Sequence, residues 1–194
     1  MVLLPPGEPG DKQAERSHTT TTSEGTQTGF VALPKVPVIL RNGNSAIKVN
    51  ALLDEDSTKT YINADVASEL GLQGISRKVT VNVLNGQTET FETMPVDAEL
   101  ESLDGSVSKT VSAFTTERVT GNLEAIDWRK HANKWPHLRD IQFPKPGPHP
   151  LVDILIGVDR VDLHYSYKDV KGRPVEPVAR LTPLGWTCVG PAST

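Results

Sequence analysis

Three carboxylates at the end of an apolar run are the residues of this chain best suited to chemistry. The apolar run 51–53 is followed at once by Asp54, Glu55 and Asp56. Two carboxylates held close together cannot both ionise, so one can accept a proton from water while the other donates one. Taken alone, the triplet is more typical of a solvated acidic turn after a strand. A hydrolytic interpretation therefore depends on the elements that position Asp54.

A second apolar run, Ile154-Leu155-Ile156, ends at Gly157 and is followed by Asp159. A short continuous apolar run of this kind, bounded by a glycine, is typical of a buried strand. The sequence therefore predicts two buried strands, one that ends at Asp54 and one that ends at Gly157.

Alternating apolar residues and turn signals predict a β-rich body around these strands. Val36, Val38 and Leu40 alternate, and the turn 41–44 leads into a partner strand over 47–53 that carries Asp54 at its end. Further along, Asn63 is a good helix N-cap and Gly71 a good left-handed C-cap, which predicts a short helix over 64–70.

Two hairpins follow the predicted helix. Asn85-Gly86, between the alternating valines of 79–83 and Phe91, best suits a type I′ turn, although most such pairs are simply hairpin turns. Asp104-Gly105 separates two further alternating segments, 96–100 and 107–113. The expected architecture is all-β, with one or two short helices.

The remaining segments divide the chain into three parts. Residues 1–35 are rich in Pro, Gly, Ser, Thr and Glu, which predicts a disordered linker. The folded domain is expected over 36–165, with an insert over about 120–150 that packs on the barrel. In this insert Trp128, Ala132 and Trp135 share one face of a short helix that Pro136 would disturb. Residues 166–194 form a C-terminal extension whose alternating apolar pattern we do not assign to a sheet.

Composition excludes several other classes of protein. The net charge of −4 argues against a chain whose main role is to grip nucleic acid, because no basic surplus is available to neutralise phosphates. Cys188 is the only cysteine, so neither an intrachain disulfide nor a cysteine zinc site can form. No apolar run approaches the ~20 residues that span a bilayer. We therefore expect a soluble, intracellular (cytoplasmic) protein with no membrane partner.

No metal or cofactor is expected. His131, His137, His149 and His164 lack metal-ligand spacing, and no nucleophile elbow of the form G-x-S-x-G occurs. The three tryptophans and Cys188 are expected to be core residues.

The order of these elements resembles a known family. Leu-Leu-Asp-x-x-Ser-Thr at 52–58, the helix that ends in Gly71, the hairpins, the tryptophan-bearing insert and Leu155-Ile156-Gly157-x-Asp159 occur in the order found in single-lobed, retropepsin-like aspartic peptidases. With Leu184-Gly185-Trp186-Thr187 at the end, the resemblance is to the aspartic peptidase region of BEL/Pao-type retrotransposon polyproteins, over roughly 36–190.

This resemblance implies a closed barrel and an aspartic endopeptidase that processes a retroelement polyprotein. Asp54 would be the catalytic carboxylate, and the second carboxylate of the dyad would come from Asp54 of a second copy in a homodimer. Asn85 and Gly86 would form the tip of a flap over a polypeptide substrate, and Ile156 and Gly157 would form the loop beneath the active strand.

The active-site loop departs from the family motif Asp-Ser/Thr-Gly. Glu55 replaces the hydroxyl residue, Asp56 replaces the glycine, and a hydroxyl follows only at Ser57. The added charges would repel across a dimer axis, so the loop must protonate, bend to expose Glu55 and Asp56, or leave the dimer unformed. We therefore expect activity that is weak and confined to acid pH, or absent. The alternative function is a catalytically inactive retropepsin-like interaction or dimerisation module, or a decayed retroelement fragment.

Overall fold

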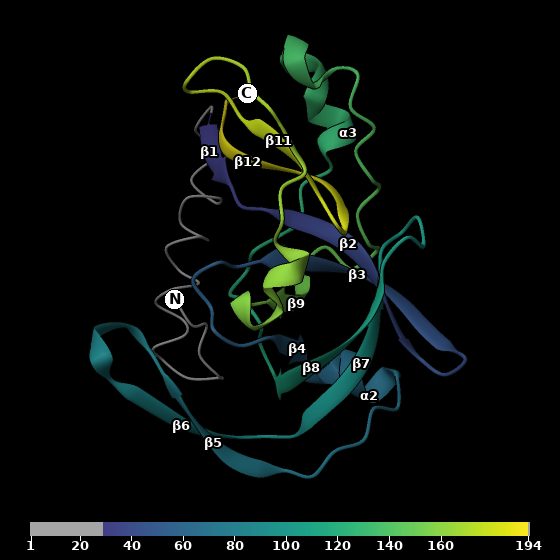
Figure 1. Cartoon of the computed structure of the whole chain (residues 1–194), viewed down its shortest axis with the longest axis vertical. Coiled ribbons are helices and arrows are strands. Elements are labelled where there is room, and N and C mark those ends of the chain that lie inside the picture. The colour runs from purple at the N-terminus through teal and green to yellow at the C-terminus, as the bar shows by residue number, and fades with distance from the viewer. Residues whose placement is uncertain (1–28, 194) are drawn as a thin grey trace.

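A closed barrel of six strands forms the body of the molecule (Figure 1). The computed structural model describes residues 29–193. The barrel order is β2-β3-β9-β4-β8-β7, closed by pairing of β7 with β2. Its strands are β2 (Lys35–Asn42), β3 (Ser45–Leu53), β4 (Tyr61–Asn63), β7 (Pro95–Glu101), β8 (Ser108–Thr116) and β9 (Val152–Ile156). The expected all-β class is confirmed, since 46% of the structure is strand and its helices are few and short.

Alternation along the strands fills the barrel. Val36, Val38 and Leu40 of β2 are buried and join Leu53 and Ile156 in one hydrophobic cluster. Ile154, Leu155 and Ile156 of β9 have no exposed surface, so this strand is covered on both faces. That double burial explains why the β9 segment is continuously apolar rather than alternating.

The predicted helix is present as α2 (Ala64–Glu69). The Asn63 side chain accepts a hydrogen bond from the Asp65 amide at 2.7 Å, which satisfies one of the free amides of the first turn. Gly71 has a φ of +68°, the left-handed conformation that ends many helices. Both predicted capping residues are therefore confirmed.

The first predicted hairpin is an arm outside the barrel, formed by β5 (Arg77–Asn82) and β6 (Thr88–Thr93). Asn85 and Gly86 have φ angles of 71° and 72°, as a type I′ turn requires, but the loop is the three-residue 3-10 turn η2 (Leu84–Gly86). Val81 and Phe91 pack on the outer face of the barrel against Tyr61 and Phe114.

A second sheet of four strands lies beyond one end of the barrel, in the order β1-β12-β11-β10 (Figure 1). Its strands are β1 (Gly29–Ala32), β10 (Lys168–Val170), β11 (Val178–Thr182) and β12 (Gly185–Ser193). The C-terminal extension, which the sequence left unassigned, therefore supplies three of these strands.

Strand β1 corrects the expected linker over 1–35. Gly29–Ala32 is paired with β12, and Lys35 already begins β2. Phe30 and Val31 favour a strand while Gly29 and Ala32 do not, and the distant β12 supplies the hydrogen bonds of β1. The rest of the predicted linker, 1–28, lies outside the described residues.

The insert packs on the second sheet. It contains α3 (Trp128–His131), η3 (Ala132–Lys134) and η4 (Pro136–Leu138), so the helix is broken where Pro136 was expected to disturb it. Trp128, Ala132 and Trp135 share a buried cluster with Ala179 and Cys188 of the sheet. Another short turn, η5 (Val158–Leu163), follows β9. Over residues 29–193, none of the helices could cross a membrane.

Candidate active-site loop

Asp54 lies at the point where β3 leaves the barrel beside β9. The two strands run parallel, with Leu53 opposite Ile156, and the Asp54 amide donates a hydrogen bond to the Ile156 carbonyl at 3.0 Å. Strand β9 also pairs antiparallel with β4, so it lies between the strands on either side of the loop 54–60. The chain therefore leaves β3 at Asp54, passes the end of β9 and returns on its other side.

Gly157 is the contact point of this crossing. The Val158 amide donates to the Ser57 carbonyl at 2.8 Å. A Cβ placed on Gly157 would lie 2.4 Å from the Lys59 carbonyl oxygen and 2.7 Å from the Ser57 carbonyl oxygen. Both contacts are with backbone, which no rotamer change relieves. Only glycine lets the two loops approach this closely.

Two hydroxyls inside the loop fix its shape. The buried Ser57 donates to the Lys59 carbonyl at 2.7 Å. The buried Thr60 accepts a hydrogen bond from the Gly157 amide at 3.2 Å and donates to an Asp159 carboxylate oxygen at 2.9 Å. The loops on either side of Gly157 are thus joined by side chains as well as by backbone.

His164 supports the same turn from the other side. Its Nε2 lies 2.9 Å from the Gly157 carbonyl oxygen. Against the larger, opposite effect of burial, His164 is also among the groups that lower the pKa of Asp54. Of the residues that stabilise the crossing, the sequence singled out Ser57, Ile156 and Gly157. It did not single out Thr60 or His164, because a lone hydroxyl or imidazole carries no local signal of a long-range contact.

The three acidic residues differ in environment. Burial raises the pKa of Asp54, an effect that a hydrogen bond from the Asp56 amide to Asp54 Oδ1 at 3.0 Å opposes. Glu55 and Asp56 are both exposed and form a turn closed by a hydrogen bond from the Ser57 amide to the Asp54 carbonyl. In the single chain Glu55 and Asp56 are therefore at the surface, while Asp54 is partly buried. A carboxylate with a raised pKa can hold a proton in mild acid, as a general acid must.

The tip of the hairpin arm lies away from the barrel (Figure 1). Asn85 and Gly86 are exposed at the end of the arm, and Figure 1 draws the arm below the barrel with its tip at the lower left. Val81 and Phe91, at the middle of the arm, lie over Tyr61, which begins β4 directly after the loop. The hairpin is therefore anchored beside the loop through its body.

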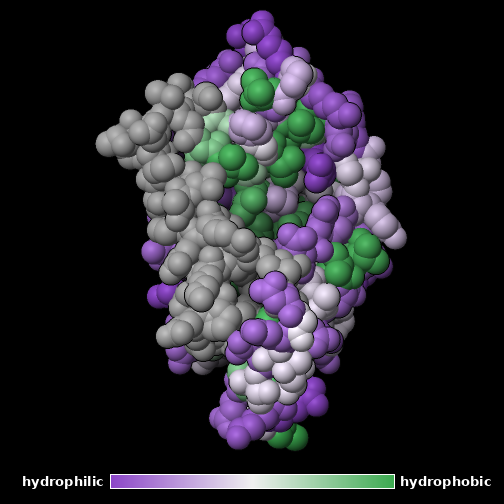
Figure 2. All heavy atoms as spheres, turned by 90° about the vertical axis from the view of Figure 1, so that its left-hand side faces the viewer, coloured by the Kyte–Doolittle hydropathy of each residue, from purple (hydrophilic) through white to green (hydrophobic). Residues whose placement is uncertain are grey.

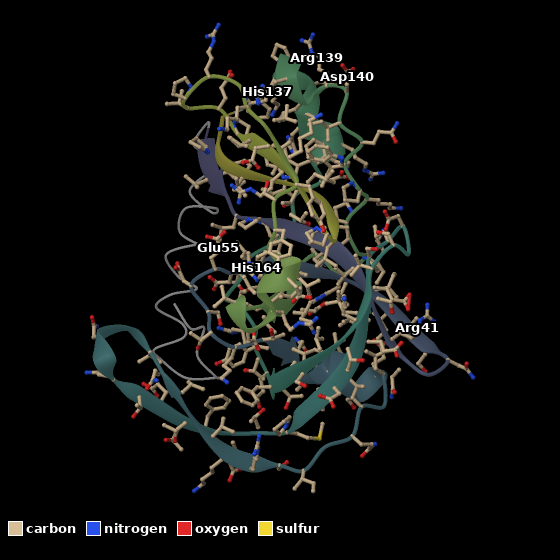
Figure 3. The ribbon with its side chains drawn as sticks, viewed as in Figure 1. Arg41, Glu55, His137, Arg139, Asp140 and His164 are labelled. Atoms are coloured by element: carbon tan, nitrogen blue, oxygen red, sulfur yellow. The ribbon has the colours of Figure 1, made fainter. Side chains whose placement is uncertain are left out.

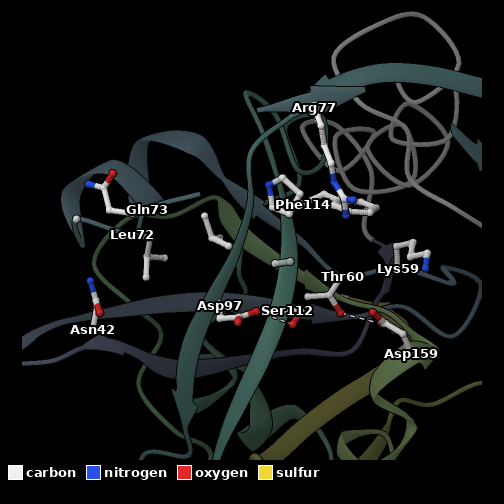
Figure 4. Close-up of a pocket in the computed structure, with 14 residues that line it drawn as sticks. Asn42, Lys59, Thr60, Leu72, Gln73, Arg77, Asp97, Ser112, Phe114 and Asp159 are labelled. Carbon is white, nitrogen blue, oxygen red and sulfur yellow. Dashed lines mark hydrogen bonds between the residues drawn. The ribbon is translucent and has the colours of Figure 1, made fainter. Parts of the chain in front are cut away.

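A polar groove of about 670 Å³ starts at the loop and runs along the barrel wall (Figure 4). Lys59, Thr60 and Asp159 line its start, and Arg77 at the base of the hairpin lies above it. Further along, Asp97 accepts a hydrogen bond from the Ser112 hydroxyl at 2.6 Å.

Metal-ligating residues do not gather near the loop. Within residues 29–193, no three His, Cys, Asp or Glu side chains are grouped so that they could hold a metal ion. His149 instead pairs with the buried Asp153 at 2.9 Å, and His137 bonds to the Pro177 carbonyl. Acid–base chemistry by Asp54 is what the loop can support with its own residues.

No protein-family model, curated protein or solved structure matches this chain.

Proposed function

We propose that this chain is a retropepsin-like aspartic endopeptidase domain of a retrotransposon polyprotein, with Asp54 as its catalytic carboxylate. The observation that carries the proposal is the crossing of the loop 54–60 with the Gly157 turn. It holds one partly buried carboxylate at the end of a barrel strand, in a loop whose Lys59 and Thr60 line a groove. The resemblance of the two motifs at 52–58 and 154–159 to that family supports the same assignment.

In the proposed reaction a homodimer brings two copies of Asp54 together. One carboxylate is ionised and accepts a proton from a water molecule, which attacks the carbonyl carbon of the peptide bond. The other is protonated and donates its proton to the carbonyl oxygen, which gives a tetrahedral intermediate. The carboxyl that took the proton from water then passes it to the amide nitrogen as the C–N bond breaks, which releases the amine and the carboxylic acid. Burial already raises the pKa of Asp54 in one chain, and a second carboxylate would raise it further. Activity is therefore expected in mild acid and lost as the pH rises.

Glu55 and Asp56 favour a second candidate, a catalytically inactive module that retains the fold for interaction or dimerisation. Neither residue supplies the hydroxyl and the glycine of the family motif, and both add charge beside Asp54. Their exposure limits the cost of that charge in the single chain, but two loops that face each other would bring it together.

Cleavage of a peptide library by the full chain, between pH 4 and 7, distinguishes the two candidates. The test compares the protein with Asp54→Asn and with the matched control Asp140→Asn, an exposed aspartate at the far end of the molecule (Figure 3). Cleavage by the protein and the control, but not by Asp54→Asn, supports the peptidase. Folded protein that cleaves nothing at any pH supports the inactive module. Cleavage that survives in Asp54→Asn excludes the proposed mechanism.

A further inference from the structure

We propose that the end of the molecule formed by the insert binds the sugar–phosphate backbone of a nucleic acid without reading its sequence. The surface concerned, here called the basic patch, consists of Arg129, Lys130, Lys134, Arg139, Lys171 and Arg173. This inference is independent of the peptidase proposal, because it uses none of the residues of the loop 54–60.

Charge is segregated along the chain although the total is −4. Residues 119–150 contain five lysines and arginines against three acidic residues, Glu124, Asp127 and Asp140, which gives this segment a net charge of +2. The chain as a whole carries 20 basic and 24 acidic residues. The overall charge therefore conceals a basic end, and the expectation of no direct nucleic-acid contact, which rested on that overall charge, does not apply locally.

Packing of the insert turns its cations outward. Trp128, Ala132 and Trp135 are buried against the second sheet, so the residues between them must face away from it. Arg129, Lys130, Lys134 and Arg139 are all exposed. Figure 1 shows α3 projecting at the upper end of the molecule, and Figure 2 shows hydrophilic residues at the tip of that end with hydrophobic ones just below it.

A loop from the second sheet brings two more cations to the same place. His137 Nε2 lies 2.7 Å from the Pro177 carbonyl oxygen. A Cβ placed on Gly172 would lie 2.4 Å from His137 Cε1, so the loop that carries Lys171 and Arg173 lies directly against the His137 ring. Both of these cations are exposed. The patch is thus assembled from two segments far apart in the sequence.

Most cations of the patch have no ion-pair partner among the described residues 29–193. Arg129 pairs with Asp127 at 2.7 Å, and within residues 29–193 the other five cations form no ion pair. The positive charge of the patch lowers the pKa of neighbouring cationic groups. The pKa of His131 is lowered by burial and then by Lys134, and the pKa of Lys48 is lowered by burial and then by Lys145 and Arg129. A polyanion would relieve this repulsion.

The shape and chemistry of the patch favour nucleic acid over an anionic membrane. Trp128, Trp135, Leu138 and Phe143 of the insert are buried, and Val175, exposed beside Arg173, is a single apolar side chain. An anionic membrane would need a larger apolar surface beside the cations. Arg139 and Arg173 offer planar forks that match phosphate oxygens, whereas the fork of Arg129 is held by Asp127. The buried tryptophans cannot stack on bases, so contact is limited to phosphates and is independent of sequence.

The test is binding of a fluorescein-labelled 20-nucleotide oligouridylate to the full chain, followed by anisotropy across a salt series. Each phosphate contact on a single strand contributes about 0.7 to the slope of log K against log salt, or about fivefold in affinity at 0.1 M salt. Lys130→Gln/Lys134→Gln and Lys171→Gln/Arg173→Gln should each weaken binding about 25-fold and flatten the slope. The matched control Lys78→Gln/Lys109→Gln removes two exposed charges from the barrel and the hairpin arm, and should change affinity less than twofold.

Two results would overturn the proposal. One is a dissociation constant above about 1 mM at 50 mM salt, far weaker than ordinary non-specific binding. The other is a control variant that loses as much affinity as the two patch variants. Parallel titrations with vesicles containing phosphatidylserine and with polyglutamate test the competing partners, and tighter binding to either of them would also contradict it.

Discussion

Replacing Gly157 with alanine tests whether the crossing of the two loops is as tight as the structure has it. The added Cβ would lie 2.4 Å from the Lys59 carbonyl oxygen, 2.7 Å from the Ser57 carbonyl oxygen and 2.8 Å from the Lys59 carbonyl carbon. All three neighbours are backbone atoms, so the loop itself must move. Gly157 has a φ of −85°, which alanine adopts readily, and the cost is therefore steric rather than conformational.

The expected loss is worked from two contributions. Overpacking a close contact costs about 1–3 kcal/mol. Displacing the loop also weakens the hydrogen bond from the Val158 amide to the Ser57 carbonyl, which contributes about 1 kcal/mol. Gly157→Ala should therefore lower the free energy of unfolding by about 2–4 kcal/mol. For a chain of this length that corresponds to a fall in Tm of roughly 10 °C.

Urea denaturation followed by far-UV circular dichroism and by tryptophan fluorescence is the appropriate assay. Trp128, Trp135 and Trp186 belong to the cluster on the second sheet, so fluorescence reports that sheet, while circular dichroism also reports the barrel. Coincident transitions would show that both unfold together. A barrel transition that moves without the fluorescence transition would locate the damage at the crossing.

Gly43→Ala is the matched control. Gly43 has a φ of +60° and no atom within 4 Å of a Cβ placed on it, so alanine there meets strain without a clash and should cost about 1 kcal/mol. If Gly157→Ala costs no more than Gly43→Ala, the close approach of the two loops is refuted, and the support for a peptidase-like crossing disappears with it.

Two further predictions concern pH and buried charge. Because burial raises the folded-state pKa of Asp54 above its ordinary 3.8, its contribution to folding is fully present below that value and is lost as the pH rises through the folded pKa. Asp54→Asn should therefore stabilise the protein at pH 7, by an amount of the order of 1 kcal/mol, but not at pH 3.5. A loss of stability at pH 7 would contradict a raised pKa of Asp54. Burial also lowers the pKa of Lys35 from 10.5 to about 8. Between these two pH values the unfolded chain binds more protons than the folded protein, so the free energy of unfolding should rise with pH. Between pH 7.5 and 10.5 the free energy of unfolding, measured by thermal unfolding, should rise by about 3 kcal/mol more in the protein than in Lys35→Met. Parallel pH profiles of the two proteins would rule out the lowered pKa of Lys35.

Features set by neighbouring residues were predictable from the sequence. The helix cap at Asn63, the left-handed Gly71 and the positive φ angles of Asn85 and Gly86 all follow from local backbone chemistry. The alternation of Val36, Val38 and Leu40 predicted a strand, and that strand is present, with its first four residues buried on both faces.

Features that depend on contacts between distant residues could not be predicted from the sequence. The pairing of β1 with β12 joins the two ends of the described chain, and neither sequence segment indicates that it pairs with the other. The three-residue loop at η2, in place of the expected two-residue turn, depends on the register of β5 and β6 rather than on Asn85-Gly86 alone. Thr60 is an ordinary hydroxyl in the sequence, and only the fold brings it to Asp159.

For the candidate site, the sequence by itself determined that a carboxylate would end one buried strand and a glycine would end another. Both are local properties, because a short apolar run is typical of a buried strand and a glycine that follows it is typical of the strand end. Only the tertiary structure decided that the two strands are parallel neighbours, that Gly157 lies against the loop of Asp54, and that burial raises the pKa of Asp54 while Glu55 and Asp56 remain exposed. The physical reason is that the desolvation of Asp54 and the close approach at Gly157 both come from atoms far away along the chain, and no local pattern encodes them.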